Sequence, residues 1–243
     1  MKKILALGIA LAMGSASARA EFTFDDIEYW VGTGSHKACL VVDWNDSKAP
    51  EALAWGFRWD GSVTRAGMVK AVAGTTYEGA MESPTIDTTY YGADPRLTLR
   101  VSQSFYGTSL FAAGYDLDAD GGTYTIGHEA PWGTSPGDPA DTETGSAGDA
   151  DDHYQEGWIT RGFWAYGTRS DLPGEENWGW YSGLDDALKN NEWVGFAFDG
   201  DTDLTNIVVP DDPEAAPVPE PATMALLVLG ALGLVRRRRR ADG

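Results

Sequence analysis

The feature that most constrains the fold is a repeated alternation of apolar residues at every second position. Trp55, Phe57 and Trp59 would share one face of a strand, with Gly56 and Arg58 on the other. Further strands are expected at 22–30, 38–44, 96–101, 109–115, 123–127, 157–166 and 193–198. Successive side chains of a strand point to opposite faces, so these segments predict an all-β domain. Its expected form is an antiparallel sandwich or a jelly-roll-like domain.

Two short helices are expected within the β domain. Residues 63–73 follow Ser62, a favourable N-cap, and residues 184–189 follow Ser182. Asp185 lies three residues after Ser182 and would complete a capping box. The β domain is expected to span residues 21–209, with an acidic mobile loop at residues 135–152.

The only cysteine is Cys39, so no disulfide can form within the chain. It lies in the apolar run ACLVVDW and is expected to be a small buried side chain. Without disulfides, an exported domain depends on its hydrophobic core for stability, and this domain is long enough to form one.

The first 20 residues have the three-part pattern of a secretory signal peptide. Lys2 and Lys3 precede an apolar run, and the segment ends in Ala18-Arg19-Ala20. Cleavage is expected before Glu21. A buried N-terminal helix is the alternative, but the charged start and the small residues at the end favour a signal helix that is removed.

The part of the chain expected to be exported is strongly acidic. Residues 21–221 contain 36 acidic and 10 basic residues, which gives a net charge near −26. Such a surface repels phosphates, so nucleic acid is not expected as a partner. A solvated acidic surface that resists aggregation is the simplest interpretation.

The C-terminus has a second apolar segment. Residues 222–235 carry no charge and are followed by five arginines. As a helix the segment would be about 21 Å long. A cytoplasmic arginine cluster with snorkelling side chains favours a short transmembrane helix. Residues 210–217, rich in proline, alanine and acid, are expected to form an extended linker before it.

The C-terminal region, residues 218–243, resembles the PEP-CTERM sorting signal of Gram-negative bacteria. The resemblance rests on Val218, Pro219, Glu220 and Pro221, the apolar segment, and the terminal cluster Arg236, Arg237, Arg238, Arg239 and Arg240. It implies processing by exosortase, a membrane-embedded cysteine transpeptidase-like enzyme. It also implies removal of the apolar tail and delivery to the outer surface or an exopolysaccharide matrix. The alternative is a permanent membrane anchor.

Alternating aspartates indicate a candidate Ca²⁺ site. Asp116, Asp118 and Asp120 precede Gly121 and resemble the start of an EF-hand loop. The twelfth position holds Gly127 instead of glutamate, so a helix-loop-helix site is not expected. A solvated acidic turn is the simpler interpretation. The spacing recurs, without a following glycine, at Asp199, Asp201 and Asp203.

A lone histidine among acids is a second candidate metal site. Asp151, Asp152, His153 and Glu156 lie close together in sequence and could serve Zn²⁺ or Mn²⁺. Neither His36 nor His128 lies nearby in the sequence, so a solvated loop is favoured.

Aromatic residues in glycine-containing loops are candidate glycan contacts, because their rings can stack on sugars. The residues concerned are Trp132, Trp178, Trp180 and Tyr181. Packing of these rings against the β-sheet is the alternative interpretation.

The sequence contains no recognisable catalytic motif such as G-x-S-x-G, H-E-x-x-H or a P-loop. The favoured function is therefore a non-catalytic surface or matrix protein that is structural or binds glycans weakly. One alternative is an extracellular polysaccharide hydrolase or lyase, whose two carboxylates can lie far apart in sequence. The other is a surface receptor for a small ligand.

Overall fold

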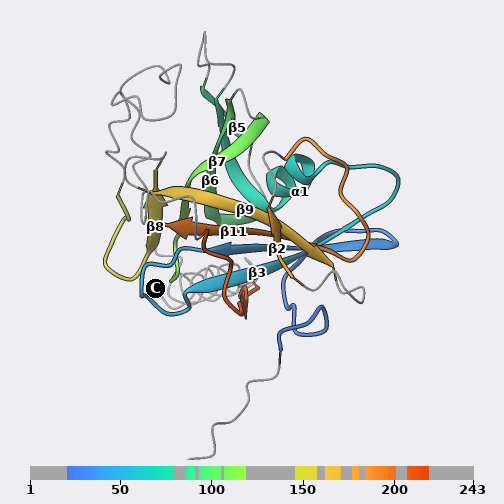
Figure 1. Ribbon diagram of the computed structural model, residues 1–243, viewed down its shortest axis with the longest axis horizontal. Coiled ribbons are helices and arrows are strands. Elements are labelled where there is room, and N and C mark those ends of the chain that lie inside the picture. The colour runs from blue at the N-terminus through green and yellow to red at the C-terminus, as the bar shows by residue number, and fades with distance from the viewer. Residues whose placement is uncertain are drawn as a thin grey trace, which may run out of the picture.

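The described residues form two β-sheets that pack face to face, with one helix at their side (Figure 1). This fold is seen in a computed structural model of the chain. The structure describes residues 21–78, 86–90, 93–104, 107–118, 146–157, 162–170, 177–180, 184–200 and 207–218. Strands of the smaller sheet cross the larger sheet at a steep angle. The prediction of an all-β domain is confirmed.

The larger sheet has seven strands in the described part of the chain. Their order is β1-β3-β2-β11-β9-β10, and β12 also pairs with β3. Their bounds are Trp30–Gly32 (β1), His36–Asp43 (β2), Ala52–Trp59 (β3), Phe163–Ser170 (β9), Gly179–Trp180 (β10), Glu192–Asp199 (β11) and Glu214–Ala215 (β12). The smaller sheet has the order β5-β4-β6-β7-β8. Its strands are Ala73–Glu78 (β4), Ile86–Tyr90 (β5), Asp94–Ser104 (β6), Gly107–Tyr115 (β7) and His153–Glu156 (β8).

Both sheets contain parallel pairs, so the expectation of antiparallel sheets is wrong. β11 runs parallel to β2, β1 and β12 run parallel to β3, and β4 runs parallel to β6. The alternation of side chains fixes which face of a strand is buried. It is the same for both strand directions, so it could not reveal the parallel pairs.

The main core lies between the two sheets and confirms the predicted faces. Trp55, Phe57 and Trp59 of β3 point into it, as do the apolar residues at alternate positions of β11. The smaller sheet contributes Leu97 and Leu99. Each of these side chains is buried, so the two sheets stabilise one another through their apolar surfaces.

A second, smaller core covers the outer face of the larger sheet. Cys39 and Trp193 belong to it, and Phe24 and Ile27 cover them. The expected burial of Cys39 is confirmed. The strand expected at residues 22–30 is wrong except at Trp30, the first residue of β1: residues 22–29 are not a strand, and Phe24 and Ile27 among them cover this face.

The one helix of the described residues is α1, Arg65–Val72. It begins later than predicted, with Thr64 in place of Ser62 as N-cap. The second expected helix, at residues 184–189, is wrong: that segment is not helical. Its carbonyls instead accept hydrogen bonds from the first N–H groups of α1, with Arg65 N–H bonding to Asp186 and Ala66 N–H to Leu184.

Several expectations fall outside the described residues. These are the signal peptide at 1–20, the strand at 123–127, the apolar segment at 222–235 and most of the acidic loop at 135–152. Of the strand expected at 157–166, β9 contains only the second part. Within the described residues, no helix is long and apolar enough to cross a membrane.

Candidate functional site

The last described segment, residues 207–218, packs against the larger sheet from the end of β11, past the end of β2, to the edge of β3; we call it the C-terminal strap. The N–H groups of Val208 and Asp211 donate to the carboxylates of Asp199 and Asp43, at 3.3 and 2.8 Å. The N–H of Ala216 donates to the carbonyl of Ala54 at 2.9 Å. The strap is therefore held at its start, its middle and its end.

The end of the strap is tied to the core. Ala216 is fully buried among core residues, and the guanidinium of Arg96 donates to the carbonyl of Pro217. Arg96 itself forms a buried ion pair with Asp94, at 2.9 Å. Residues 210–217 were expected to be a linker separate from the domain; they are instead part of its packed structure. The proline and acid content of this segment correctly indicated an extended backbone. It did not indicate that the segment packs against the domain.

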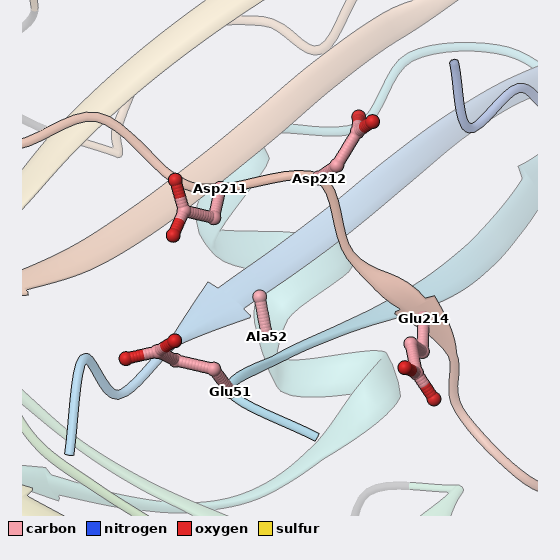
Figure 2. A pocket seen from close by; sticks show the side chains of 5 residues that line it. All are labelled: Glu51, Ala52, Asp211, Asp212 and Glu214. Atoms are coloured by element: carbon pink, nitrogen blue, oxygen red, sulfur yellow. The ribbon is translucent and has the colours of Figure 1, made fainter. Parts of the chain in front are cut away.

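A pocket opens between the strap and the start of β3 (Figure 2). Its volume is about 280 Å³. Ala52 at the start of β3 and Glu51 in the turn before it line one side of the pocket. The strap contributes the other lining residues, which are Asp211, Asp212 and Glu214. Four of its five lining side chains are carboxylates, so the pocket repels anions and favours cationic groups.

Asp43 lies buried at the end of β2, beside this pocket. The pKa of Asp43 is raised to about 6, mainly by burial and to a smaller extent by the neighbouring carboxylates of Asp211 and Glu51. The hydrogen bonds from the N–H groups of Asp211 and Asn45 oppose this shift, because they stabilise the charged form. The strap therefore depends on a carboxylate whose ionisation is made costly by burial.

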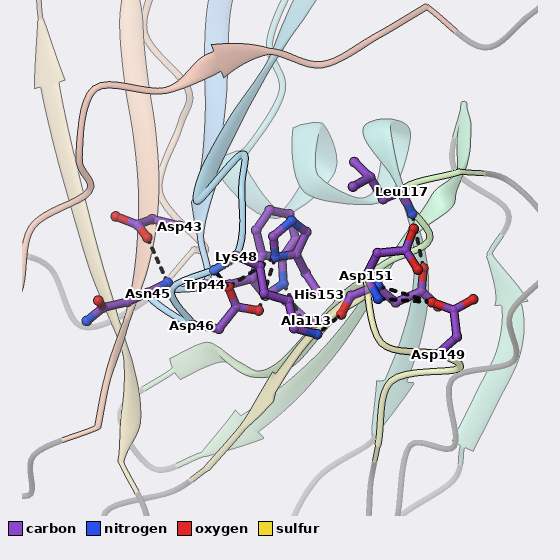
Figure 3. Close-up of polar contacts among 11 residues, drawn as sticks. Asp43, Trp44, Asn45, Asp46, Lys48, Ala113, Leu117, Asp149, Asp151 and His153 are labelled. Atoms are coloured by element: carbon purple, nitrogen blue, oxygen red, sulfur yellow. Dashed lines mark hydrogen bonds and ion pairs between the residues drawn. The ribbon is translucent and has the colours of Figure 1, made fainter.

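A second acidic region lies where β7 and β8 pair (Figure 3). Asp116 and Asp118 follow β7, and Asp149, Asp151 and Asp152 precede β8. Asp116 and Asp152 are buried, whereas the other three are exposed. The pairing of Tyr115 with His153 brings the two groups to the same end of the smaller sheet.

Asp152 is the unusual member of this region. One carboxylate oxygen accepts from the N–H of Leu117 at 3.1 Å, while the other is buried and has no hydrogen-bond partner among the described residues. Burial raises the pKa of Asp152, and the charges of Asp149 and Asp116 act in the same direction. Among the described residues, no three acid, histidine or cysteine side chains lie close enough to hold a metal ion. Asp120 lies outside the described residues, so the predicted Ca²⁺ site stays a prediction.

The interpretation of residues 151–156 as a solvated loop is wrong for three of its four acid and histidine residues. Asp152, His153 and Glu156 are buried, and β8 contains the last two. The Nδ1 of His153 lies 3.0 Å from the carboxylate of Asp46, and its ring stacks on Trp44. Lys48 donates to the backbone carbonyl of Asp152 (Figure 3). The turn after β2 thus fixes the start of β8.

Of the predicted glycan contacts, the structure shows the side chain of Trp178 only. Trp178 is half-buried and lies against the outer face of the larger sheet, over Gly195 and Gly167. The guanidinium of Arg169 lies 5.3 Å from its ring. Trp180 belongs to β10, and its side chain is not described. Trp132 and Tyr181 lie outside the described residues, and the glycan contact stays a prediction.

Of the remaining residues predicted from the sequence, the structure describes only Asp199 and Val218. Asp199 is buried and accepts from the N–H of Val208, whereas Asp201 and Asp203 lie outside the described residues. Val218 is 54% exposed and is the last described residue. The rest of the predicted sorting signal, from Pro219 to Arg240, lies beyond it.

Comparison with known proteins identifies one feature of the chain. Residues 217–240 match the family model of the PEP-CTERM protein-sorting motif. No curated protein and no solved structure matches the chain. The family match therefore covers the C-terminal motif and does not extend to the β domain.

The motif match confirms the resemblance seen in the sequence. It marks the chain for export and for exosortase-mediated sorting to the cell surface. Sequence reasoning located this motif but missed the strap, the acidic pocket and the contact between Asp46 and His153. The strap has one weak signal, since a pair of alanines, Ala215 and Ala216, allows close approach to a sheet.

Proposed function

We propose that this chain is a non-catalytic component of the cell surface or exopolysaccharide matrix, structural or weakly glycan-binding. One observation carries the proposal: the packed domain continues to Pro217, where the sorting motif begins. The folded β domain is therefore the cargo of the motif. A membrane-spanning tail at residues 222–235 would hold the chain during export until exosortase removes it.

The buried charges support a role without catalysis. Arg65 donates two hydrogen bonds to Glu192, at 2.8 and 3.2 Å, and one to the exposed carboxylate of Asp186. These contacts join α1 to β11 and to the segment before it. Arg96 and Asp94 similarly join β6 to the strap. Such pairs hold elements together, and their charges are satisfied by one another.

For the glycan contact we propose the exposed surface around Trp178, with Trp132, Trp180 and Tyr181 as further rings. Trp178 lies on the sheet beside Arg169, so a sugar would meet an aromatic edge and a cationic donor together. Replacing Trp178 with alanine should then reduce retention of the purified domain on the host's exopolysaccharide.

For the cofactor we propose Ca²⁺, held by Asp116, Asp118 and Asp120 as the spacing predicts. Asp152 favours this region over the strap pocket, because one of its buried oxygens has no hydrogen-bond partner in the described part of the chain and Asp149 lies nearby. A divalent cation would neutralise carboxylates that otherwise repel one another.

The test of the sorting role replaces Pro219, Glu220 and Pro221 with alanines in the full chain, expressed in a host that contains exosortase. The wild-type protein should lose its tail and reach the outer surface or the matrix. The variant should keep its tail and remain in the inner membrane, as measured by fractionation and mass spectrometry of the C-terminus.

A matched control is Asp212→Asn, an exposed change on the strap outside the tripeptide. It should be sorted as wild type. Normal release of the triple-alanine variant would overturn the sorting role. Release of reducing or unsaturated sugars from the host's exopolysaccharide by the purified domain would overturn the non-catalytic role.

A further inference from the structure

We propose that the C-terminal strap must detach from β3 before exosortase can process the chain, so that docking of the strap controls the processing rate. This inference rests on the proposed sorting function. It concerns one segment, residues 207–218, which two partners need: the edge of β3 in the folded domain, and the enzyme that reads the adjoining tripeptide.

The spacing between the domain and the tripeptide is too short for both partners at once. Only Val218 separates Pro217, whose carbonyl is bonded to Arg96, from Pro219. An extended chain covers at most about 3.6 Å per residue, so the tripeptide begins within about 7 Å of the domain. Enzymes that cut a chain act on segments that are exposed and free of the folded structure.

The contacts of the docked strap are few enough for it to detach while the rest of the domain stays folded. β12 pairs with β3 over two residues only, Glu214 with Leu53 and Ala215 with Ala54. The strap's buried residues in its second half are Pro213 and Ala216, which are small. Local opening of such segments requires much less free energy than global unfolding.

Like charges on the two sides of the strap favour its opening. Asp211, Asp212 and Glu214 of the strap line one pocket together with Glu51 (Figure 2). The buried Asp43 adds a further carboxylate near Asp211 and Glu51. These carboxylates repel one another and weaken docking. The backbone hydrogen bonds to Asp43, Asp199 and Ala54 oppose that repulsion.

Processing itself exchanges one bond for another. A cysteine thiolate of the enzyme attacks a backbone carbonyl carbon beside the tripeptide, a C–S bond forms, and the C–N peptide bond breaks. The tail leaves as an amine that takes up a proton. Water or an amine then attacks the thioester, which forms the new C-terminus and restores the thiolate. The attacked carbonyl must enter the active site of the enzyme, and the hydrogen bond from Arg96 to the carbonyl of Pro217 keeps the adjoining chain close to the domain surface.

The experiment locks the strap with a disulfide. Ala54 and Ala215 are paired residues of adjacent strands, so Ala54→Cys with Ala215→Cys places two thiols at a separation that a disulfide can bridge. Cys39→Ala removes the native thiol in the same chain. Pulse-chase labelling in a host with exosortase then measures the rate at which the tail is lost. We expect the locked chain to be processed at least tenfold more slowly, and a reductant to restore the wild-type rate.

A variant with a spacer tests whether the disulfide slows processing by holding the tripeptide close to the domain or by some other effect. Insertion of six Gly/Ser residues between Val218 and Pro219 should restore processing of the locked chain, because the tripeptide is then free of the strap. Processing of the locked chain at the wild-type rate would overturn the inference. Failure of the spacer to rescue it would also overturn it. Failure of the wild-type chain to be processed would instead overturn the proposed function.

A second variant tests the same idea without a disulfide. Ala216→Asp puts a carboxylate at a fully buried position and should release the end of the strap while the sheets stay folded. Processing should be at least threefold faster than in wild type. An unchanged or slower rate, with the domain shown to be folded by circular dichroism, would contradict the inference.

Discussion

β1 and β12 pair in parallel with the same strand, β3, and the contrast between them shows how one sheet edge can hold two segments with unequal strength. β1 pairs with residues 56–58 and β12 with residues 53–54. Both lie at the edge of the larger sheet, and each comes from one end of the described chain (Figure 1).

Aromatic packing holds β1. Trp30 lies over Gly56, where a Cβ atom would come within 2.4 Å of its ring. The guanidinium of Arg58 lies 4.3 Å from the same ring, and the indole N–H donates to the carbonyl of Ile27. β12 has no aromatic residue, and Ala216, the residue directly after it, contributes only a methyl group to the core. The comparison indicates that β1 is held more firmly on the edge of β3 than β12 is.

The largest expected effect comes from Arg96, which links the strap to the core. Arg96→Met leaves the fully buried carboxylate of Asp94 without its cation and should lower the free energy of unfolding by about 3–5 kcal/mol. Chemical denaturation measures it. In the double variant with Asp94→Asn, part of this loss should return, because no buried charge is left unpaired; no recovery would show that Arg96 acts through packing alone.

The next effect tests the contact that holds β1. Trp30→Ala should lower the free energy of unfolding by about 2–3 kcal/mol, since the ring is half-buried. Gly56→Ala should also destabilise the wild type, because the added methyl group meets the Trp30 ring. In the Trp30→Ala background the same glycine change should cost little. Equal costs in both backgrounds would contradict the close approach.

The third effect is the pH dependence of strap docking. The pKa of Asp43 is raised to about 6 in the folded state, above its ordinary value of 3.8. The folded state therefore binds more protons between these values, and its stability should fall by about 2 kcal/mol as the pH rises from about 4 to 6. The protection of residues 208–216 against hydrogen exchange, measured relative to the intrinsic exchange rate at each pH, should fall over the same range.

Variants at two positions isolate this contribution from that of other acids. Asp43→Asn cannot ionise and should remove this part of the slope, while Asp212→Asn at the exposed rim should keep it. A slope that is unchanged in Asp43→Asn would assign the pH dependence to other carboxylates.

The smallest effect compares the two acidic regions. Millimolar Ca²⁺ should raise the Tm by about 2–4 °C, equivalent to about 1 kcal/mol, if the region beside β8 binds it. Asp116→Asn combined with Asp118→Asn should abolish the shift, and Asp212→Asn in the strap pocket should preserve it. No shift in the wild type would remove the calcium proposal.

The sequence predicted the strands of the domain better than their arrangement. Alternation located β2, β3, β6, β7 and β11, because each buries one face in the main core. It could not show that β11 pairs in parallel with β2, since these strands are distant in the chain and alternation has no direction. The helix expected at 184–189 failed because its carbonyls bind the start of α1, a tertiary contact without a local signal.

The functional features divide in the same way. The sorting motif is linear, so Val218 to Pro221 and the arginine cluster could be identified from sequence order alone. The acidic pocket combines Glu51 with residues 160 positions later, and only the fold brings them together. Asp43 ends an ordinary strand, and its raised pKa depends on burial that no sequence pattern indicates.

Parallel pairing of β12 with β3 also has a mechanical consequence. A load applied through the C-terminus acts first on the two-residue pairing and the few bonds of the strap, before it reaches the sandwich. Residues 207–218 would then be free of the sheet and could span up to about 40 Å in total, while both sheets remain intact. A domain held through its C-terminus would then have a longer tether under tension, and the strap would dock again when the tension falls.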